Sequence, residues 1–174
     1  MKILKTKFNG TYIIQHSKSE DLRGFFMRGF CEKILKKKGI NFKIKQTNFS
    51  FNKKKHTLRG FHFQKKPFSE DKLITCIKGK LLVVLVNINK NSKNYLKHIK
   101  INLSSNLNHS VLISKNCATA YFTLTDDTLV FYYMSNFYKK TKSQGFRYND
   151  PKLNIKWPKK PKIISKKDLG FENL

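Results

Sequence analysis

The chain of 174 residues has few cysteines, prolines and glycines, and it has no apolar run long enough to span a bilayer. Its three cysteines (Cys31, Cys76 and Cys117) are odd in number and have no paired spacing, which argues against a disulfide framework. We expect them to be small core residues in a reducing cytoplasm. The segment Met1–Lys5 holds too few apolar side chains for a signal peptide. Without repeats or a flexible linker, the length predicts a single domain over residues 1–174.

Carboxylates and arginines are also scarce, although the chain is strongly basic. Asp and Glu number 10 against 37 Lys and Arg, which gives a formal net charge of +27 at pH 7. Nearly all of the positive charge is lysine spread along the whole chain, because the only arginines are Arg23, Arg28, Arg59 and Arg147. Arginine is the residue expected to dominate base and phosphate recognition. The distribution therefore predicts nonspecific attraction to polyanions at low salt, and no functional nucleic-acid binding.

Short β-strand patterns fill most of the chain. Residues 42–48 alternate between apolar and polar side chains, which predicts a half-buried strand. Residues 81–88 are continuously apolar, which is typical of a strand buried on both faces. Further strands are expected at 10–14, 24–28, 73–77, 96–103, 111–114, 118–124 and 128–134. Many short, evenly spaced strands predict an all-β sandwich or barrel, and a jelly-roll barrel fits because alternate strand residues line its interior.

Two parts of the chain depart from the strand pattern. Residues 31–38 form the one plausible helix, with Gly39 just past its end at the position of a C-cap glycine. The C-terminal region carries Asn149-Asp150-Pro151, Trp157-Pro158 and Pro161, so we expect an irregular tail that lies against the outside of the domain. The expected architecture is thus a jelly roll with one or two short helices and an irregular C-terminal tail.

The segment 57–64, Thr-Leu-Arg-Gly-Phe-His-Phe-Gln, is the most informative stretch. In a regular strand, Gly60, His62 and Gln64 share one face. A histidine on the inner face of a sheet, close to the fixed charge of Arg59, suits proton transfer on an anionic substrate. A lone histidine on a half-buried strand is more often structural, so the pattern by itself leaves both interpretations open.

Other candidate residues carry weight only in combination. Asp168 is one of very few carboxylates; it could cap a short helix, orient a histidine or have no role. Tyr132 and Tyr133 face opposite ways in a strand, so one of them could point inward. Lys72 lies just before a strand. The histidines lack the two-apart spacing that would place two imidazoles on one ion, and there is no glycine-rich phosphate loop, so neither a metal nor a cofactor is expected.

Taken together and in order, these segments resemble the dTDP-4-dehydrorhamnose 3,5-epimerase family over nearly the whole chain. Each segment is weak evidence alone, but their order and spacing are specific. The matching segments are 21–26, 46–48, 58–64, 72–73 with Gly79, Tyr132, 145–151, 155–158 and 165–168. The family is a metal-free, cupin-type jelly roll that works as a homodimer. The resemblance implies an enzyme of deoxysugar and surface-polysaccharide biosynthesis that inverts carbons 3 and 5 of a nucleotide-linked 4-keto-6-deoxy sugar.

The resemblance also implies a role for each matching residue. His62 would be the base and Asp168 would orient it. Lys72 would stabilise the enolate oxygen, and Tyr132 would return a proton from the opposite face of the sugar. The residues implied in substrate binding are Arg23 and Arg59 at the diphosphate, Phe26 against the base, and Gln46, Asn48, Thr119 and Tyr138 along the sugar and nucleotide pocket.

Three positions depart from the family pattern. Thr119 replaces a second active-site histidine, Arg28 falls where the family often has an acid, and Ser19 falls where an aromatic side chain often packs on the base. These changes leave the nucleotide and the sugar open. The alternatives are a sugar 3,4-ketoisomerase or a 3-epimerase on the same barrel, and a non-catalytic barrel that binds a sugar or a polyanion.

Overall fold

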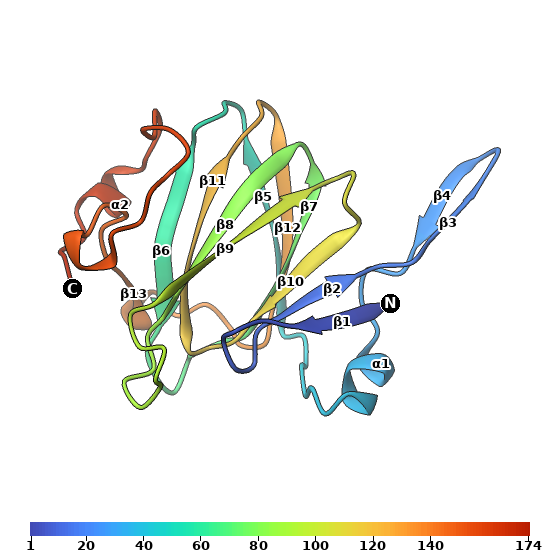
Figure 1. Ribbon diagram of the computed structural model, residues 1–174, viewed down its shortest axis with the longest axis horizontal. Coiled ribbons are helices and arrows are strands. Elements are labelled where there is room, and N and C mark those ends of the chain that lie inside the picture. Colours follow the sequence, from blue (N-terminus) through green and yellow to red (C-terminus); the bar gives the residue numbers. More distant parts are fainter.

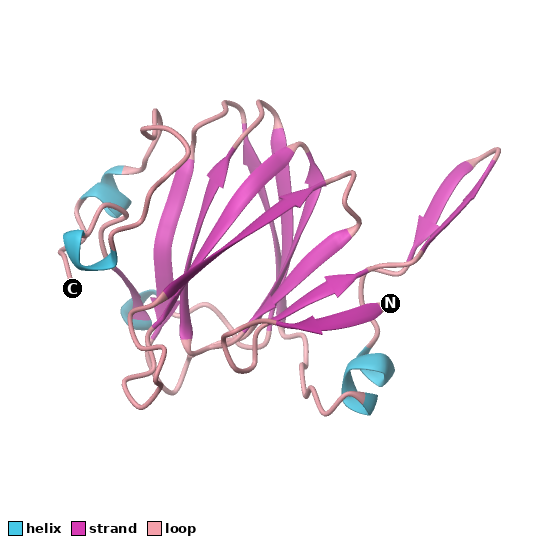
Figure 2. Ribbon diagram, viewed as in Figure 1, coloured by secondary structure: helices cyan, strands magenta, loops and turns pink.

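The computed structural model describes residues 1–174, and its body consists of two antiparallel β-sheets packed face to face (Figures 1 and 2). The six-stranded sheet runs, in spatial order, β1 (Lys2–Lys5), β2 (Tyr12–Gln15), β10 (His109–Ile113), β7 (Lys72–Lys78), β12 (Thr128–Met134) and β5 (Gln46–Asn52). The five-stranded sheet runs β13 (Ser143–Gly145), β6 (Leu58–Gln64), β11 (Cys117–Thr123), β8 (Lys80–Asn87) and β9 (His98–Ser104). The predicted all-β jelly roll is therefore confirmed.

Strand β8 shows why a continuous apolar run suits this fold. Its residues Leu81, Val83 and Leu85 lie between the two sheets, in a core that also contains Ile74 of β7 and Val130 of β12. The intervening residues of β8 face the other way, into a second cluster on the outside of the five-stranded sheet. Both faces of β8 are therefore buried, as the sequence predicts.

The C-terminal region covers the outer face of the five-stranded sheet. It contains two 3-10 turns, η1 (Lys140–Lys142) and η2 (Pro151–Leu153), and the short helix α2 (Lys166–Leu169). Tyr148, Ile155 and Trp157 pack against the outer cluster, where the Trp157 ring lies 6.1 Å from those of Phe61 and Phe122. In Figure 1 this red segment lies beside β6. The tail is irregular and external, as expected, and its packing places α2 next to the strand that carries His62.

The N-terminal region contributes a helix and a projecting hairpin. Helix α1 (Glu32–Lys37) is followed by Gly39, whose φ of +72° fits its predicted place at the helix end. Strands β3 (Lys18–Asp21) and β4 (Gly24–Met27) pair only with each other. Figure 1 shows this hairpin standing away from the body of the domain. At its tip Leu22 is fully exposed, and Phe26 of β4 is 71% exposed.

One predicted strand is misplaced. Residues 42–48 were expected to be a strand, but β5 begins only at Gln46 and continues to Asn52, in register with all of β12. Phe42 instead packs with Leu35 of α1 and Ile14 of β2 in a small separate cluster. The alternation around Phe42 therefore reflects a loop that covers this cluster, not pairing in a sheet.

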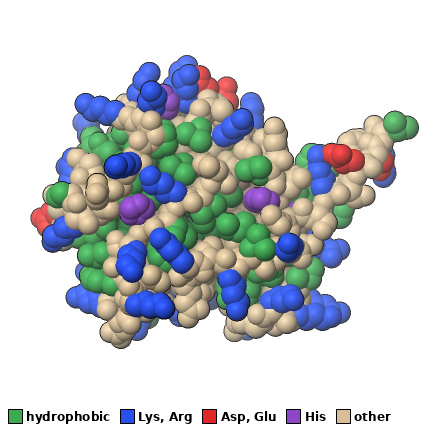
Figure 3. Space-filling model, viewed as in Figure 1, with side chains coloured by type: hydrophobic (Ala, Val, Ile, Leu, Met, Phe, Trp, Pro, Cys, Tyr) green, Lys and Arg blue, Asp and Glu red, His purple; other side chains and the backbone are tan.

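In Figure 3, Lys and Arg side chains are scattered over the visible face and are not gathered in one stripe. A clustered basic surface is the usual footprint of nucleic-acid binding. No helix has the length and apolar character needed to cross a membrane.

Candidate active site

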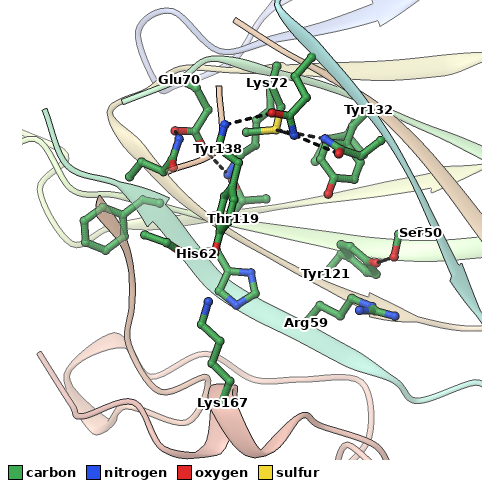
Figure 4. A pocket seen from close by; sticks show the side chains of 17 residues that line it. Ser50, Arg59, His62, Glu70, Lys72, Thr119, Tyr121, Tyr132, Tyr138 and Lys167 are labelled. Atoms are coloured by element: carbon green, nitrogen blue, oxygen red, sulfur yellow. Dashed lines mark hydrogen bonds and ion pairs between the residues drawn. The ribbon is translucent and has the colours of Figure 1, made fainter. Parts of the chain in front are cut away.

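An open cavity of about 370 Å³ lies between the sheets and receives side chains from both of them. Strands β5, β7 and β12 contribute from the six-stranded sheet, and β6 and β11 contribute from the five-stranded sheet (Figure 4). Most of the predicted site residues line it: Gln46, Asn48, Arg59, His62, Lys72, Thr119, Tyr132 and Tyr138. The fold thus brings together residues that are spread over more than half of the sequence.

His62 is held from behind by the buried carboxylate of Asp168. The His62 Nε2 atom lies 2.7 Å from Asp168 Oδ1, and the backbone N–H of Gly60 donates to Asp168 Oδ2 at 3.1 Å. Asp168 is only 4% exposed. Helix α2 presents it there, and the Ser165 hydroxyl caps this helix by accepting from the Asp168 N–H. Of the alternatives that the sequence leaves open for Asp168, the geometry selects the orientation of a histidine.

The surroundings of Asp168 keep it ionised. Burial is the largest single influence and opposes the charge, but the hydrogen bond and charge of His62 and the N–H of Gly60 together outweigh it. The pKa of Asp168 therefore lies below its ordinary value. A charged carboxylate at this position favours the imidazolium that forms when His62 accepts a proton.

Strand β6 is not regular, which corrects the predicted face for Gly60. Its pairing with β11 shifts register between Arg59 and His62, and Gly60 has a φ of +115°. A Cβ at Gly60 would lie 2.5 Å from the Thr119 carbonyl oxygen, so the close approach of the two strands requires glycine. Because of this irregularity, Arg59 and His62 both line the cavity, although strict alternation would put them on opposite faces. Gly60 itself does not line the cavity.

Lys72 and Tyr132 come from neighbouring strands of the other sheet. Lys72 is the first residue of β7, and its side chain is 13% exposed. Burial raises the pKa of Tyr132 above its ordinary value, so this phenol stays protonated near neutral pH. Tyr133 faces the outside and packs against Phe30 and Phe131. The prediction that one of the two tyrosines points inward is confirmed.

The remaining polar wall is built on β5 and β6. Arg59 donates from Nε to Asn52 Oδ1 at 2.9 Å, which fixes its guanidinium beside the edge of the six-stranded sheet. The Gln46 amide donates to Asn48 Oδ1 at 3.0 Å, and Gln46 Oε1 accepts from the Tyr138 backbone N–H at 3.0 Å. These amides and the guanidinium are the groups a sugar and a phosphate require for recognition.

Two predicted binding residues lie outside this cavity. Arg23 and Phe26 are on the projecting hairpin β3–β4. The Arg23 guanidinium pairs with Asp21 through an Nη2–Oδ2 contact of 2.6 Å. Within one chain, the structure therefore does not bring this pair to the cavity.

Several residues of the cavity were missed from the sequence: Lys167, Glu70, Ser50 and Tyr121. The Tyr121 hydroxyl lies 2.7 Å from Ser50 Oγ and bridges the two sheets. Alternation along β11 gave a usable signal, because Tyr121 follows Thr119 by two residues. Lys167 gave no such signal, since only the position of α2 turns it toward the cavity (Figure 4).

The set of side chains suits proton transfer at a carbon next to a carbonyl. A histidine with a carboxylate behind it and a protonated phenol enter from opposite sheets, and Arg59, Lys72 and Lys167 supply positive charge for an anionic ligand. No group of three or more His, Cys, Asp or Glu side chains is placed to hold a metal ion.

Comparison with known proteins gives the same chemistry. A family model described as dTDP-4-dehydrorhamnose 3,5-epimerase matches residues 5–174. This chain belongs to the dTDP-4-dehydrorhamnose 3,5-epimerase family. Relatives of that name from Shigella flexneri and Methanothermobacter thermautotrophicus are each 32% identical to it, over 98% and 99% of this chain and 94% of each relative. The predicted family and the enzyme class, an epimerase among the isomerases, are confirmed.

Solved structures of the family have the same fold. The dTDP-4-dehydrorhamnose 3,5-epimerase of Bacillus anthracis, with TDP and PPi bound, superposes with a TM-score of 0.96 at 31% identity and covers 99% of both chains. The Legionella pneumophila enzyme, in complex with dTDP-4-keto-L-rhamnose, superposes with a TM-score of 0.93 at 28% identity, over 99% of this chain and 92% of that one. These epimerase structures confirm the cupin-type jelly roll.

Proposed function

We propose that this protein inverts C3 and C5 of a dTDP-linked 4-keto-6-deoxy sugar in deoxysugar biosynthesis. One observation carries the proposal: His62, backed by Asp168, and the protonated Tyr132 reach one cavity from opposite sheets. Lys72 reaches the same cavity from β7, the strand next to that of Tyr132. Inverting a carbon requires a base on one face of the sugar and an acid on the other. The relatives named for this reaction support the choice of a dTDP sugar.

The 4-keto group acidifies the C–H bonds at C3 and C5, and an enolate forms when either proton leaves. His62 takes the proton through Nδ1, since Nε2 is held by Asp168. The ammonium of Lys72 stabilises the oxygen of the enolate. Tyr132 then delivers a proton to the other face of the carbon. Each inversion leaves an imidazolium and a phenolate, so solvent removes the proton from His62 and returns one to Tyr132 before the next inversion.

The diphosphate needs cations at the mouth of the cavity. Arg59 is fixed there by Asn52, and Lys167 adds a second positive charge from α2. A guanidinium can bind a phosphate through two parallel hydrogen bonds. Gln46 and Asn48 offer amide groups to the sugar and the nucleoside.

We further propose that the protein is a homodimer in which the hairpin β3–β4 of one chain completes the site of the other. The hairpin carries Arg23 and the exposed Phe26, and it has no packing partner in its own chain other than itself. The outer face of the edge strand β5 is also apolar, with Phe49 71% and Phe51 49% exposed. Exposed apolar clusters of this kind mark protein interfaces, and a two-fold dimer would place each hairpin on the partner in the same way.

Mixing two inactive variants tests the exchange of hairpins. Arg23→Ala removes the cation on the hairpin, and His62→Ala removes the base. Co-expressed chains should recover about a quarter of the wild-type rate, because about half of randomly paired dimers are mixed and each of these has one intact site. If the hairpin served its own chain, or if the protein were a monomer by light scattering, mixing would restore nothing.

The substrate is tested by product analysis. The protein is incubated with dTDP-4-keto-6-deoxyglucose and with the GDP and CDP analogues, and the sugar ring is assigned by NMR. The proposal predicts a product inverted at C3 and C5, formed from the dTDP sugar. A product inverted only at C3 would make the protein a 3-epimerase, and an unchanged substrate in every reaction would overturn the proposal.

We place this reaction in the cytoplasm, where reducing conditions keep cysteines free. The three cysteines are unpaired, and two of them are buried.

A further inference from the structure

Glu70 is the only carboxylate among the side chains that line the cavity. The chain has 10 acidic residues against 37 basic ones, and this one lies where a diphosphate sugar is to bind. A free carboxylate there would repel the ligand. The Glu70 side chain is also only 2% exposed, and a buried charge is strongly unfavourable unless it is paired and hydrogen-bonded. Its position therefore calls for a role that outweighs this disadvantage.

Both oxygens of Glu70 are engaged by other residues of the cavity. Oε1 lies 3.0 Å from Lys72 Nζ, and Oε2 accepts from Gln64 Nε2 at 3.0 Å. Gln64 is itself 5% exposed, and its amide also reaches the carbonyl oxygens of Phe68 and Phe137 at 2.9 and 3.1 Å. The carboxylate is thus anchored by β6 and by two loops, and it directs one oxygen at the lysine.

We propose that Glu70 is a positioning residue that holds the Lys72 ammonium at the site of the enolate oxygen. This inference rests on the function proposed above, in which Lys72 stabilises the enolate, and it names Glu70 as the group that fixes the position of Lys72. Asp168 contacts His62 in a comparable way, so the base and the lysine are each paired with a buried carboxylate. A lysine side chain carries its ammonium on a flexible four-carbon stem, and a fixed counter-ion keeps that charge at one place before the enolate forms.

The surrounding charges explain why a carboxylate is needed at this point. The other titratable or charged groups that face the cavity are Arg59 and His62 of β6, Tyr121 of β11, Tyr132 of β12, Tyr138 and Lys167. None of them is a carboxylate, and Arg59 and Lys167 are cations that repel the ammonium of Lys72. Burial is the main cause of the raised pKa of Tyr132, and the negative charge of Glu70 adds to it. Glu70 thereby also helps to keep the phenol protonated.

The test is the variant Glu70→Gln, which keeps the shape of the side chain and removes its charge. We expect kcat to fall by about 10-fold or more with little change in KM, a smaller loss than removal of Lys72 itself. The alkaline limb of the pH profile should move to lower pH, because the pKa of Tyr132 falls when the negative charge beside it is removed. Glu70→Asp, which keeps the charge, should recover part of kcat and the original alkaline limb.

Asp71→Asn is the matched control on the same loop. The Asp71 carboxylate accepts from the Lys115 backbone N–H at 2.7 Å and does not line the cavity, so kcat and the alkaline limb should stay at wild-type values. Thermal melts of all variants show whether they fold. If Glu70→Gln does not fold, the test is made with Glu70→Asp. Wild-type kcat and an unmoved alkaline limb in folded Glu70→Gln would overturn the inference while leaving the proposed function intact. A wild-type protein without epimerase activity would overturn both.

Discussion

Replacing Asp168 by Asn tests the orientation of the base. The Gly60 N–H donates to one carboxylate oxygen and His62 Nε2 contacts the other. An asparagine satisfies Gly60 only if its amide oxygen takes the first place, and its NH₂ group then faces Nε2. That NH₂ must donate to Nε2, so the ring proton of neutral His62 moves to Nδ1, the nitrogen that has to accept the substrate proton. The variant thus selects the wrong tautomer.

The size of the effect follows from the alternative orientation. Turning the amide around leaves the buried N–H of Gly60 without an acceptor, which costs about 1–3 kcal/mol. Since each 1.4 kcal/mol is about a factor of ten, the productive tautomer falls to between about a fifth and somewhat under a hundredth of the population. We expect kcat of Asp168→Asn to fall by about 5- to 140-fold, and kcat of His62→Ala to fall further because the base itself is lost.

Steady-state measurement of epimerised product at neutral pH is the assay. Ser165→Ala is the control: it removes the cap of α2 and lowers the melting temperature, but it leaves the carboxylate in place, so its kcat should change much less. A folded Asp168→Asn enzyme with wild-type kcat would refute the reasoning, as would a Ser165→Ala enzyme that loses as much activity as Asp168→Asn.

Three further outcomes are expected. The pKa of Asp168 is lower in the folded state, so its contribution to stability is complete above the unfolded pKa of about 3.9 and is lost as pH falls through the folded pKa. Below about pH 4 the melting temperature should therefore fall more steeply with pH for wild type than for Asp168→Asn. Parallel curves of melting temperature against pH would contradict this. Gly60→Ala should destabilise the fold by more than about 1 kcal/mol in urea unfolding, because it combines a positive φ with a Cβ that would lie 2.5 Å from a carbonyl oxygen; an unchanged midpoint would contradict it. Thr119 Oγ1 is buried without a hydrogen-bond partner, so Thr119→Val should leave the melting temperature unchanged or higher and raise KM, whereas an unchanged KM would show that this hydroxyl does not serve the substrate.

Local patterns predicted the strands well. The uninterrupted apolar run of β8 predicted a strand buried on both faces. The opposite directions of the Tyr132 and Tyr133 side chains followed from the alternation of a strand alone. The pairing of His62 with Asp168 joins residues 106 positions apart. No local pattern contains that contact: the residues alone left it as one of three possibilities for Asp168, and the resemblance to a family singled it out.

Other features depend on contacts between strands, which a single strand does not encode. The irregularity at Gly60 exists because β11 approaches β6 closely there, and it puts Arg59 and His62 on one side against the rule of alternation. Glu70 gave no sign of its place beside Lys72, since a carboxylate two residues before a strand is usually solvated. The strand expected at residues 42–48 failed because Phe42 is buried against a helix.

The most direct test of the central claim is the incorporation of solvent deuterium at C3 and C5, followed by NMR in D₂O with dTDP-4-keto-6-deoxyglucose. Wild type should place deuterium at both carbons and invert them. His62→Ala should do neither, and Tyr132→Phe should still exchange protons on the His62 face while inversion is lost, because the base and the acid lie on opposite sides of the sugar. Deuterium incorporation at the wild-type rate in His62→Ala, or inversion at the wild-type rate in Tyr132→Phe, would contradict the assignment of these two residues.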